Sequence, residues 1–271
     1  MLYPGWGTWC LAGDGIPRVV VDPCVSHLLD EPCAEQHQVQ ADLVLLTHGH
    51  HEHIRDIHRL AYDANVPIVA PPQVIKYLVD FRNMAPEQFL EIIPGRELLC
   101  KGVRVRAHSF PHLEKHDVAG KLAILKRDNP LGALRMLLRF GPRILSSWRA
   151  IRHQPEEGPY LAYDLSFATG TRVLFTCEAF TELLEDQAVL SWVGQTEEVV
   201  DLAIVGVESG YEQHAARLLD LLAPTRALAA AIHQPFERFY GKPPVVGDRL
   251  LARTKVPTTW MRAGTEASVP G

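Results

Sequence analysis

Four of the chain's thirteen histidines, together with a glutamate, fall within one short motif, His48-Gly49-His50-His51-Glu52-His53. A single histidine on an apolar face is usually a packed core residue, but such crowding has no strong structural explanation. Neutral imidazole rings and carboxylates are common ligands of zinc and related ions. These residues, called the histidine motif below, therefore favour a metal site.

The spacing within the histidine motif divides its side chains between two places. On a tight loop, His48 and His50 project to the same side and can share one metal ion. Glu52 and His53 begin the following helix and can face a second ion beside the first. Because catalytic zinc sites use three or four protein ligands, each ion needs further ligands from elsewhere in the chain.

Predicted strands and helices surround the histidine motif. Short apolar runs predict buried strands at 18–22, 42–47 and 66–70, and the motif directly follows the second of them. Apolar residues at three- and four-residue steps predict a helix over 52–64. Further predicted elements are strands at 102–107 and 200–207, and a hairpin of strands 160–166 and 171–176 that turns at Gly170. Helices are predicted at 72–81, 181–189 and 214–222. This pattern favours an α/β sandwich with helices covering sheets over an all-β barrel.

Length, charge and cysteine content are those of a folded, soluble protein. The 271 residues suffice for one large domain or two small ones. A net charge of −5 counts against binding nucleic acid through global charge. Five scattered cysteines disfavour a disulfide framework or a structural zinc knuckle. With neither a signal-peptide pattern nor a run of about eighteen apolar residues, the sequence predicts a cytoplasmic location.

Residues 121–153, called the basic segment below, differ from the rest of the chain in charge. They include eight Lys and Arg residues and one acid, which gives a net charge of +7. Because the whole chain has a net charge of −5, the remaining residues together carry −12. Apolar residues interleave with these charges in an amphipathic pattern. The simplest interpretation is a solvated helical pair with an apolar underside. The alternatives are a basic lid for an anionic substrate and a contact with a membrane surface.

The histidine motif resembles the HxHxDH signature of the metallo-β-lactamase-fold hydrolases, with Glu52 at the position of the usual Asp. Four further segments resemble this family in the same order. Residues 18–23 are similar to the family's early strand, which ends in Asp-Pro. Residues 102–107, followed by His112, are similar to the strand that leads to a third histidine. Residues 173–178 resemble the strand that supplies a bridging carboxylate, and 229–233 end where the last histidine ligand belongs.

The resemblance implies a fold, a domain organisation and a ligand set. The fold would be a four-layer αββα sandwich of the metallo-β-lactamase type, with one domain over 1–271 and a basic helical insertion at about 121–155. Its cofactors would be two divalent metal ions, zinc by preference, with iron or manganese as alternatives. The implied ligands are His48, His50 and His112 at one ion, Glu52, His53 and His233 at the other, and Glu178 between them.

Some assignments within this ligand set stay open. His108 and His116 lie four residues to either side of His112, and either could replace it as the third ligand. Glu52 and Glu178 each have one methylene more than the usual Asp, which could change the metal, the separation of the ions or the bridging role.

Four further residues near the expected site are assigned roles outside the ligand set. Cys177 stands where Gly is usual, and a cysteine packed among apolar groups is favoured over a ligating or oxidisable one. Asp22 is expected to orient a ligand imidazole from outside the ligand shell. His51 is expected to be a supporting or surface residue, as is His58.

The activity that the resemblance implies is hydrolysis by a hydroxide that two metal ions generate, with Glu52 and Glu178 as the catalytic carboxylates. The chain is most similar to the branch that includes ascorbate-phosphate lactonase and the phospholipase D that releases N-acylethanolamines. This branch implies an ester-like bond, phosphodiester or lactone, in an anionic small molecule or lipid. A nucleic-acid substrate is not expected, because the rest of the chain is acidic.

Two other functions are considered as alternatives to hydrolysis. Carboxylate-rich dinuclear sites also suit iron, so a di-iron oxidoreductase or oxygenase on the same fold is the main alternative. A degenerate protein that only binds metal or a partner is disfavoured, because all seven candidate ligands are retained.

Overall fold

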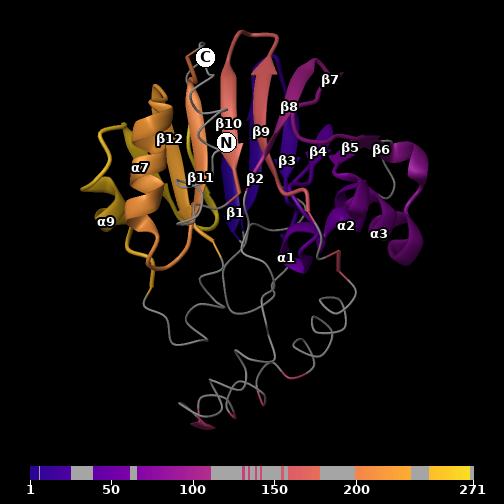
Figure 1. Cartoon of the computed structure of the whole chain (residues 1–271), viewed down its shortest axis with the longest axis horizontal. Helices are drawn as coiled ribbons and strands as arrows, with labels where there is room; N and C mark the ends of the chain where they lie inside the picture. The colour runs from indigo at the N-terminus through magenta and orange to yellow at the C-terminus, as the bar shows by residue number, and fades with distance from the viewer. Residues whose placement is uncertain are drawn as a thin grey trace.

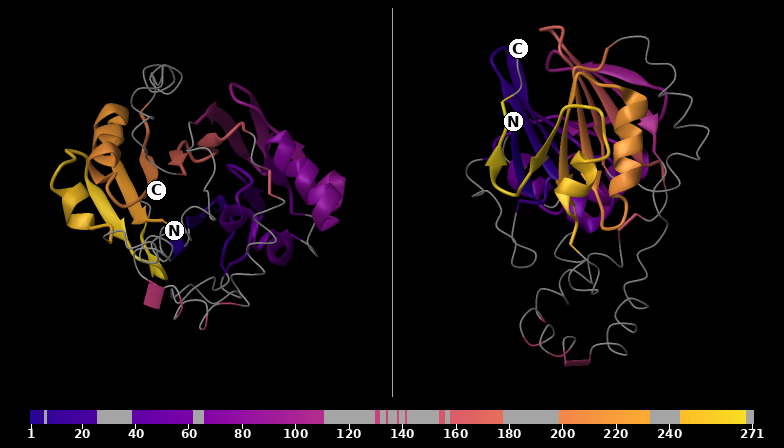
Figure 2. Two further views of the ribbon diagram at one scale, coloured as in Figure 1. Left: turned by 60° about the horizontal axis from the view of Figure 1, so that its bottom comes forward. Right: turned by 90° about the vertical axis from the view of Figure 1, so that its left-hand side faces the viewer.

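The computed structural model describes residues 1–5, 7–25, 39–61, 66–110, 154–155, 158–177, 199–232 and 244–268, together with positions 130, 131, 134, 138 and 141. Two seven-stranded sheets face each other, and helices lie on their outer sides (Figure 1). The right-hand view of Figure 2 shows the sheets edge-on, with α7 (Glu212–Leu222) on the outer face of the second sheet. The predicted αββα sandwich is therefore confirmed.

The first sheet brings the end of the early strand beside the start of the histidine motif. Its strands, in spatial order, are β14 (Thr265–Glu266), β1 (Leu2–Gly5), β2 (Thr8–Gly13), β3 (Ile16–Val21), β4 (Leu43–Leu45), β5 (Ile68–Ala70) and β6 (Phe89–Glu91). Strands β3 and β4 are parallel, and Val21 pairs with Leu45. Because parallel strands end at the same edge of a sheet, the residues that follow both strands meet there.

The second sheet combines an antiparallel half with a parallel half. Its strands, in spatial order, are β13 (Thr258–Met261), β12 (Arg226–Ala231), β11 (Leu202–Val207), β10 (Arg172–Thr176), β9 (Leu161–Phe167), β8 (Val103–Ser109) and β7 (Glu97–Cys100). The predicted hairpin of β9 and β10 is confirmed, with Gly170 at φ 88° in its turn. Parallel pairing from β10 to β13 sends the ends of these strands to one edge.

Five α-helices in the described residues cover the two sheets. They are α1 (His51–Ile54), α2 (Ile57–Ala61) and α3 (Pro72–Arg82) on the first sheet, and α7 and α9 (Gly247–Leu251) on the second. The short 3₁₀ helix η2 (Pro86–Gln88) precedes β6. The predicted helix at 72–81 and that at 214–222 are confirmed as α3 and α7. The predicted helix at 181–189 lies outside the described residues.

The single helix predicted over 52–64 is wrong, because the structure has two short helices there. The chain turns at residues 55–56, between α1 and α2. The backbone N–H of Asp56 donates to the carbonyl oxygen of Pro23 at 3.0 Å, in the loop that follows β3. This contact takes up an N–H that would otherwise continue the helix, so a partner distant in sequence overrides the local helical pattern.

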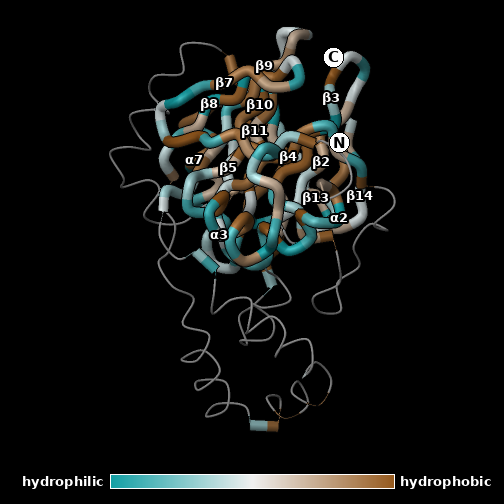
Figure 3. Tube along the Cα trace, turned by 90° about the vertical axis from the view of Figure 1, so that its right-hand side faces the viewer, coloured by the Kyte–Doolittle hydropathy of each residue, from teal (hydrophilic) through white to brown (hydrophobic). Residues whose placement is uncertain are grey.

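An apolar core fills the space between the sheets, and hydrophobic residues dominate strands β9, β10 and β11 (Figure 3). Two hydrogen bonds cross from β9 to the end of β4. The Tyr163 hydroxyl donates to Leu46 O at 2.6 Å, and Leu161 N donates to Thr47 O at 3.0 Å. Complete burial raises the pKa of the Tyr163 phenol well above its ordinary value, and the nearby Asp22 charge adds to this effect. Tyr163 is therefore a permanent donor that fixes the residues just before the histidine motif.

The domain organisation stays a prediction, since the proposed insertion at about 121–155 lies mostly outside the described residues. Within the described part of the chain, no helix is both long enough and apolar enough to cross a membrane.

A close approach between β11 and the end of β10 gives a first prediction. A Cβ atom added at Gly206 would lie 2.0 Å from the carbonyl oxygen of Cys177. We expect Gly206→Ala to lower the free energy of unfolding by about 1–3 kcal/mol, because one of the two strands must move. Gly13→Ala is the control, since its Cβ would meet only the Ile16 side chain, at 3.6 Å. Urea unfolding that shows equal loss in both variants would contradict this account.

A buried ion pair on the outward face of the second sheet gives a second prediction. Arg172 contacts both carboxylate oxygens of Asp164, at 2.9 and 2.6 Å. Burial alone raises the pKa of Asp164, but the hydrogen bonds from Arg172, together with the nearby His108 imidazole, outweigh this effect and lower the pKa to about 2. This carboxylate therefore contributes about 2 kcal/mol of stability above pH about 4, and the contribution is lost as pH falls through about 2.

The measurement is the free energy of unfolding at pH 6 and at pH 2.5, for the wild type and for Asp164→Asn. The variant should be less stable at pH 6 and should lose less stability between the two pH values. The same loss in both proteins would show that this carboxylate does not titrate as described.

Candidate metal centre

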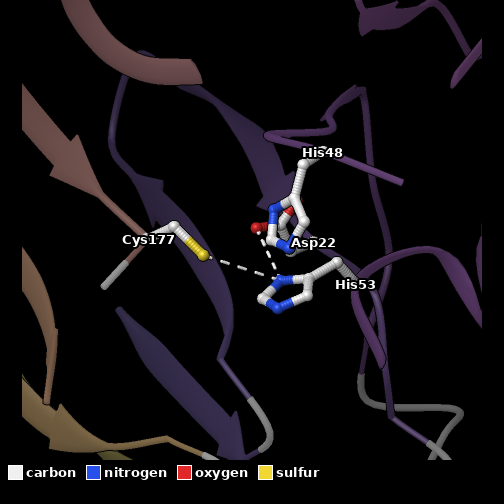
Figure 4. Close-up of side chains that lie close together, drawn as sticks. All are labelled: Asp22, His48, His53 and Cys177. Carbon is white, nitrogen blue, oxygen red and sulfur yellow. Dashed lines mark hydrogen bonds and ion pairs between the residues drawn. The ribbon is translucent and has the colours of Figure 1, made fainter. Parts of the chain in front are cut away.

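Asp22 is the buried centre of a hydrogen-bond network beside the histidine motif (Figure 4). It follows β3 with a left-handed backbone, φ 49°, a conformation that Asp tolerates better than most residues. Its Oδ1 accepts from Thr47 N at 2.8 Å, and its Oδ2 accepts from the Thr47 hydroxyl at 2.6 Å. The same Oδ2 lies 3.0 Å from Nδ1 of His53. The prediction that Asp22 orients an imidazole of the motif is confirmed as a contact with His53.

The donors and acceptors of this network assign the protons on two imidazole rings. A carboxylate only accepts, so His53 carries its proton on Nδ1 and donates it to Asp22. The Thr47 hydroxyl donates its one proton to Asp22. It therefore accepts a hydrogen bond from Nδ1 of His48, which is 2.8 Å away. In a neutral ring protonated at Nδ1, the lone pair is on Nε2. Both rings are thus set to offer Nε2 to a metal ion.

The described part of the histidine motif is buried and closely packed. The ring centroids of His48 and His53 are 4.0 Å apart, and those of His48 and His50 are 4.5 Å apart. The Glu52 side chain, in the first turn of α1, is also buried. Burial of several imidazoles with a carboxylate is the environment that a catalytic metal ion requires.

Residues 154–155 hold the loop of the histidine motif from outside. Gln154 Oε1 accepts a hydrogen bond from His51 N at 2.9 Å. A Cβ atom added at Gly49 would lie 2.1 Å from Cγ of Pro155, so only glycine fits this position. The C-terminal neighbours of the basic segment therefore contact the loop that carries His48 and His50.

Cys177, which follows β10, lies beside the same imidazole as Asp22. It is buried in the core between the sheets, which agrees with the prediction of a packed cysteine. Its Sγ is 3.7 Å from Nδ1 of His53. Potential ligand atoms of Asp22, His48, His53 and Cys177 all lie within 4.8 Å of one another, which is compact enough for one ion. However, Asp22 and Cys177 both face Nδ1, so the hydrogen bonds favour them as supports of His53 rather than as ligands.

Three of the seven predicted ligands, His48, His50 and His53, lie close together, and a fourth, Glu52, is buried in the first turn of α1. The other three, His112, Glu178 and His233, lie outside the described residues, as does the alternative His116. The other alternative, His108, has its Nε2 3.9 Å from Asp164 Oδ2, in the ion pair on the outward face of the second sheet.

Of the remaining histidines near the motif, His51 is buried and His58 is half-buried on α2. Burial lowers the pKa of His51 to about 4, so this imidazole is neutral at pH 7. Two residues beside the motif were not identified from the sequence. They are Thr47 and Tyr160, and the ring centroid of Tyr160 is 5.5 Å from that of His48. The position of Thr47, at the end of a predicted strand and directly before the motif, is the one signal that could have identified it.

The donor set fits a divalent metal ion. Two imidazoles already have the tautomer that ligation through Nε2 needs, and a buried carboxylate follows within the same motif. Imidazole with carboxylate suits zinc, iron and manganese alike, so these donors do not select one metal.

Comparisons with known proteins agree with this fold. The family profile described as the β-lactamase superfamily domain matches residues 17–178, more than half of the chain. A UPF0173 metal-dependent hydrolase of Thermoplasma acidophilum is 29% identical over 128 residues, which are 46% of this chain and 51% of that protein. This chain therefore spans about half the length of that curated relative.

Solved structures share the fold at low sequence identity. Igni18, a metallo hydrolase of Ignicoccus hospitalis, has a TM-score of 0.63 and 14% identity over 97% of this chain and 95% of its own. CmlA, a diiron β-hydroxylase of Streptomyces venezuelae, has a TM-score of 0.52 and 14% identity over 93% of this chain and 48% of its own. From the profile match, the chain belongs to the β-lactamase superfamily, and its structure has the metallo-β-lactamase fold.

Proposed function

We propose that this chain is a metal-dependent hydrolase that acts on an ester-like bond in an anionic substrate. The observation that carries the proposal is the close packing of the buried imidazoles of His48, His50 and His53, with Asp22 fixing the His53 ring. The T. acidophilum relative, named a metal-dependent hydrolase, supports the same activity.

The proposed site holds two divalent ions, zinc by preference. Such a pair lowers the pKa of a bound water towards roughly 7 and polarises the scissile group. Its proposed ligands are His48, His50 and His112 at one ion, Glu52, His53 and His233 at the other, and Glu178 between them. Glu52 and Glu178 are also the proposed catalytic carboxylates.

The described residues prepare the site for this chemistry. Asp22 keeps the His53 proton on Nδ1, and Thr47 keeps the His48 proton on Nδ1, so neither ring must change tautomer on ligation. The core between the sheets packs directly behind this network and excludes water from that side.

The proposed substrate class is an anionic small molecule or lipid with a phosphodiester or lactone bond. The basic segment carries a net charge of +7 in an otherwise acidic chain. Gln154 and Pro155, which follow the basic segment in sequence, contact the loop of the histidine motif. A local positive field beside an active site raises the local concentration of anions. Scattered cysteines support a cytoplasmic location.

A second candidate is a di-iron oxidoreductase on the same fold. Two glutamates among the proposed ligands favour a hard, carboxylate-rich site, which suits iron. The solved diiron β-hydroxylase shows that a protein of this fold can carry out such chemistry.

Metal analysis combined with a substrate panel tests both candidates. We expect protein purified without chelator to contain about two zinc ions per chain and to hydrolyse a phosphodiester or a lactone. His50→Ala and His53→Ala should each lower metal content and kcat/KM together, the latter by about 100-fold or more, because a ligand is lost. His58→Ala, a change outside the candidate centre, should alter neither quantity.

Two results would contradict the proposal. Full metal content in both His50→Ala and His53→Ala would show that the ions bind elsewhere. Two irons with an oxygen-sensitive visible spectrum, and no hydrolysis of any panel member, would favour the oxidoreductase.

A further inference from the structure

The outward face of the antiparallel half of the second sheet carries a groove. It has a volume of about 750 Å³ and is lined by residues of β7, β8 and β9 and by the start of β10. Of the described helices on this sheet, α7 packs against β11 and α9 against β13, on the other half. Leu99, in the lining of the groove, is 76% exposed. The groove is therefore open to solvent and large enough for a small organic molecule.

The register of the sheet places an arginine on each side of a serine in this groove. Arg104 of β8 pairs with Ser166 of β9, and Ser166 pairs with Arg172 of β10. Neighbouring strands lie about 4.8 Å apart, so the two arginine backbones are about 10 Å apart, with Ser166 between them. All three side chains line the groove. We call it the arginine groove below.

The described charged residues of the arginine groove have an excess of positive charge. They are three arginines and two acids, namely Arg104, Arg106, Arg172, Glu97 and Asp164. Three positive and two negative charges leave a net charge of +1, in a chain whose net charge is −5. Positive charge that lines a concave site raises the local concentration of anions.

Two of these arginines share a single carboxylate. Arg104 Nη1 lies 3.4 Å from one oxygen of Glu97, and Arg106 Nη2 lies 3.1 Å from the other. Both arginine side chains are more than half exposed. Exposed ion pairs of this kind contribute little to stability, so either guanidinium group can turn towards an incoming anion at low cost.

The hydroxyl group of Ser166 adds a further donor beside Arg104. Among the residues that the structure describes, none forms a hydrogen bond with this hydroxyl. A guanidinium group donates two parallel hydrogen bonds to an oxyanion, and a hydroxyl group can donate a third. Three donors match the three free oxygens of a phosphate group better than the two of a carboxylate. Leu99, which pairs with Arg104 from β7, offers an apolar contact to the rest of a ligand.

The arginine groove lies away from the candidate metal centre. Strand β9 begins at Leu161, whose N–H donates to Thr47 O beside the histidine motif. Ser166 is five residues further along this strand, which is about 16 Å at about 3.3 Å per residue. In Figure 1, the turn between β9 and β10 is at the top of the view and α1 is at the bottom. A small ligand in the groove therefore does not reach the metal centre.

We propose that the arginine groove binds the phosphate group of a small organic phosphate, with Arg104 and Ser166 as donors and Leu99 against the organic part. Arg106 and Arg172 add positive charge, and Glu97 competes with the ligand for the guanidinium groups. The site does not depend on the proposed hydrolase activity, and its test uses no turnover.

The test is titration of the isotope-labelled full-length protein with phenylphosphonate, followed by NMR shifts of assigned backbone amides. We expect saturable shifts at the amides of Arg104 and Ser166, and weaker binding in high salt. Neutral benzyl alcohol should bind at least tenfold more weakly, because it lacks the charge. Inorganic phosphate should bind at least threefold more weakly, because it lacks the apolar part.

Three variants test the roles of single side chains. Arg104→Gln should bind phenylphosphonate at least tenfold more weakly, because a charged donor is lost. Glu97→Gln should bind it at least threefold more tightly, because the competing carboxylate is removed. The matched control is Arg249→Gln, which removes an exposed arginine near Glu212 and should bind as the wild type does. Thermal unfolding confirms that each variant is folded.

Four results would overturn the proposal. The first is a wild-type protein without saturable shifts at Arg104 and Ser166 up to the solubility limit of the probe. The second is a set of shifts confined to the histidine motif, because the anion would then bind at the metal centre. The third is equal affinity in Arg104→Gln and in the Arg249→Gln control. The fourth is weaker binding in Glu97→Gln, because this carboxylate would then support the ligand rather than compete with it.

Discussion

A single buried carboxylate, that of Asp22, is the constraint on which the candidate centre depends. It accepts two hydrogen bonds from Thr47 and one from His53, and it is completely buried. A buried charge is tolerated only when such bonds compensate its lost hydration. The network therefore cannot relax without large cost, and this rigidity decides which nitrogen of each neighbouring imidazole faces the metal side.

The two-sheet architecture creates that constraint from residues far apart in sequence. Parallel pairing of β3 with β4 sets Asp22 beside Thr47. The second sheet then fixes the same point from the other side, through Tyr163 and Leu161 of β9. Cys177 extends this support from the end of β10 to the His53 ring. The same contacts that pack the two sheets together therefore also orient the side chains of the candidate centre.

Much of this arrangement could be predicted from local sequence. Apolar runs predicted β3, β4 and β5, and a glycine turn predicted the hairpin of β9 and β10, because buried strands have strong local patterns. The histidine motif pointed to His48, His50, Glu52 and His53, the candidate ligands that the structure describes. The break between α1 and α2 could not be predicted, since it depends on a contact from Asp56 to Pro23. Glycine at position 49 likewise depends on Pro155, more than a hundred residues away. His112, Glu178 and His233 stay predictions from the resemblance.

The most direct test of the account is the zinc affinity of Asp22→Asn, measured by competition with a chelating dye. Asparagine keeps the size of the side chain but removes the charge that holds the His53 proton on Nδ1. The account predicts about 10–100-fold weaker zinc binding with the fold retained. Asp42→Asn, a change at an exposed aspartate paired with Arg18, should leave the affinity unchanged. Wild-type affinity in Asp22→Asn would contradict the central role of this carboxylate.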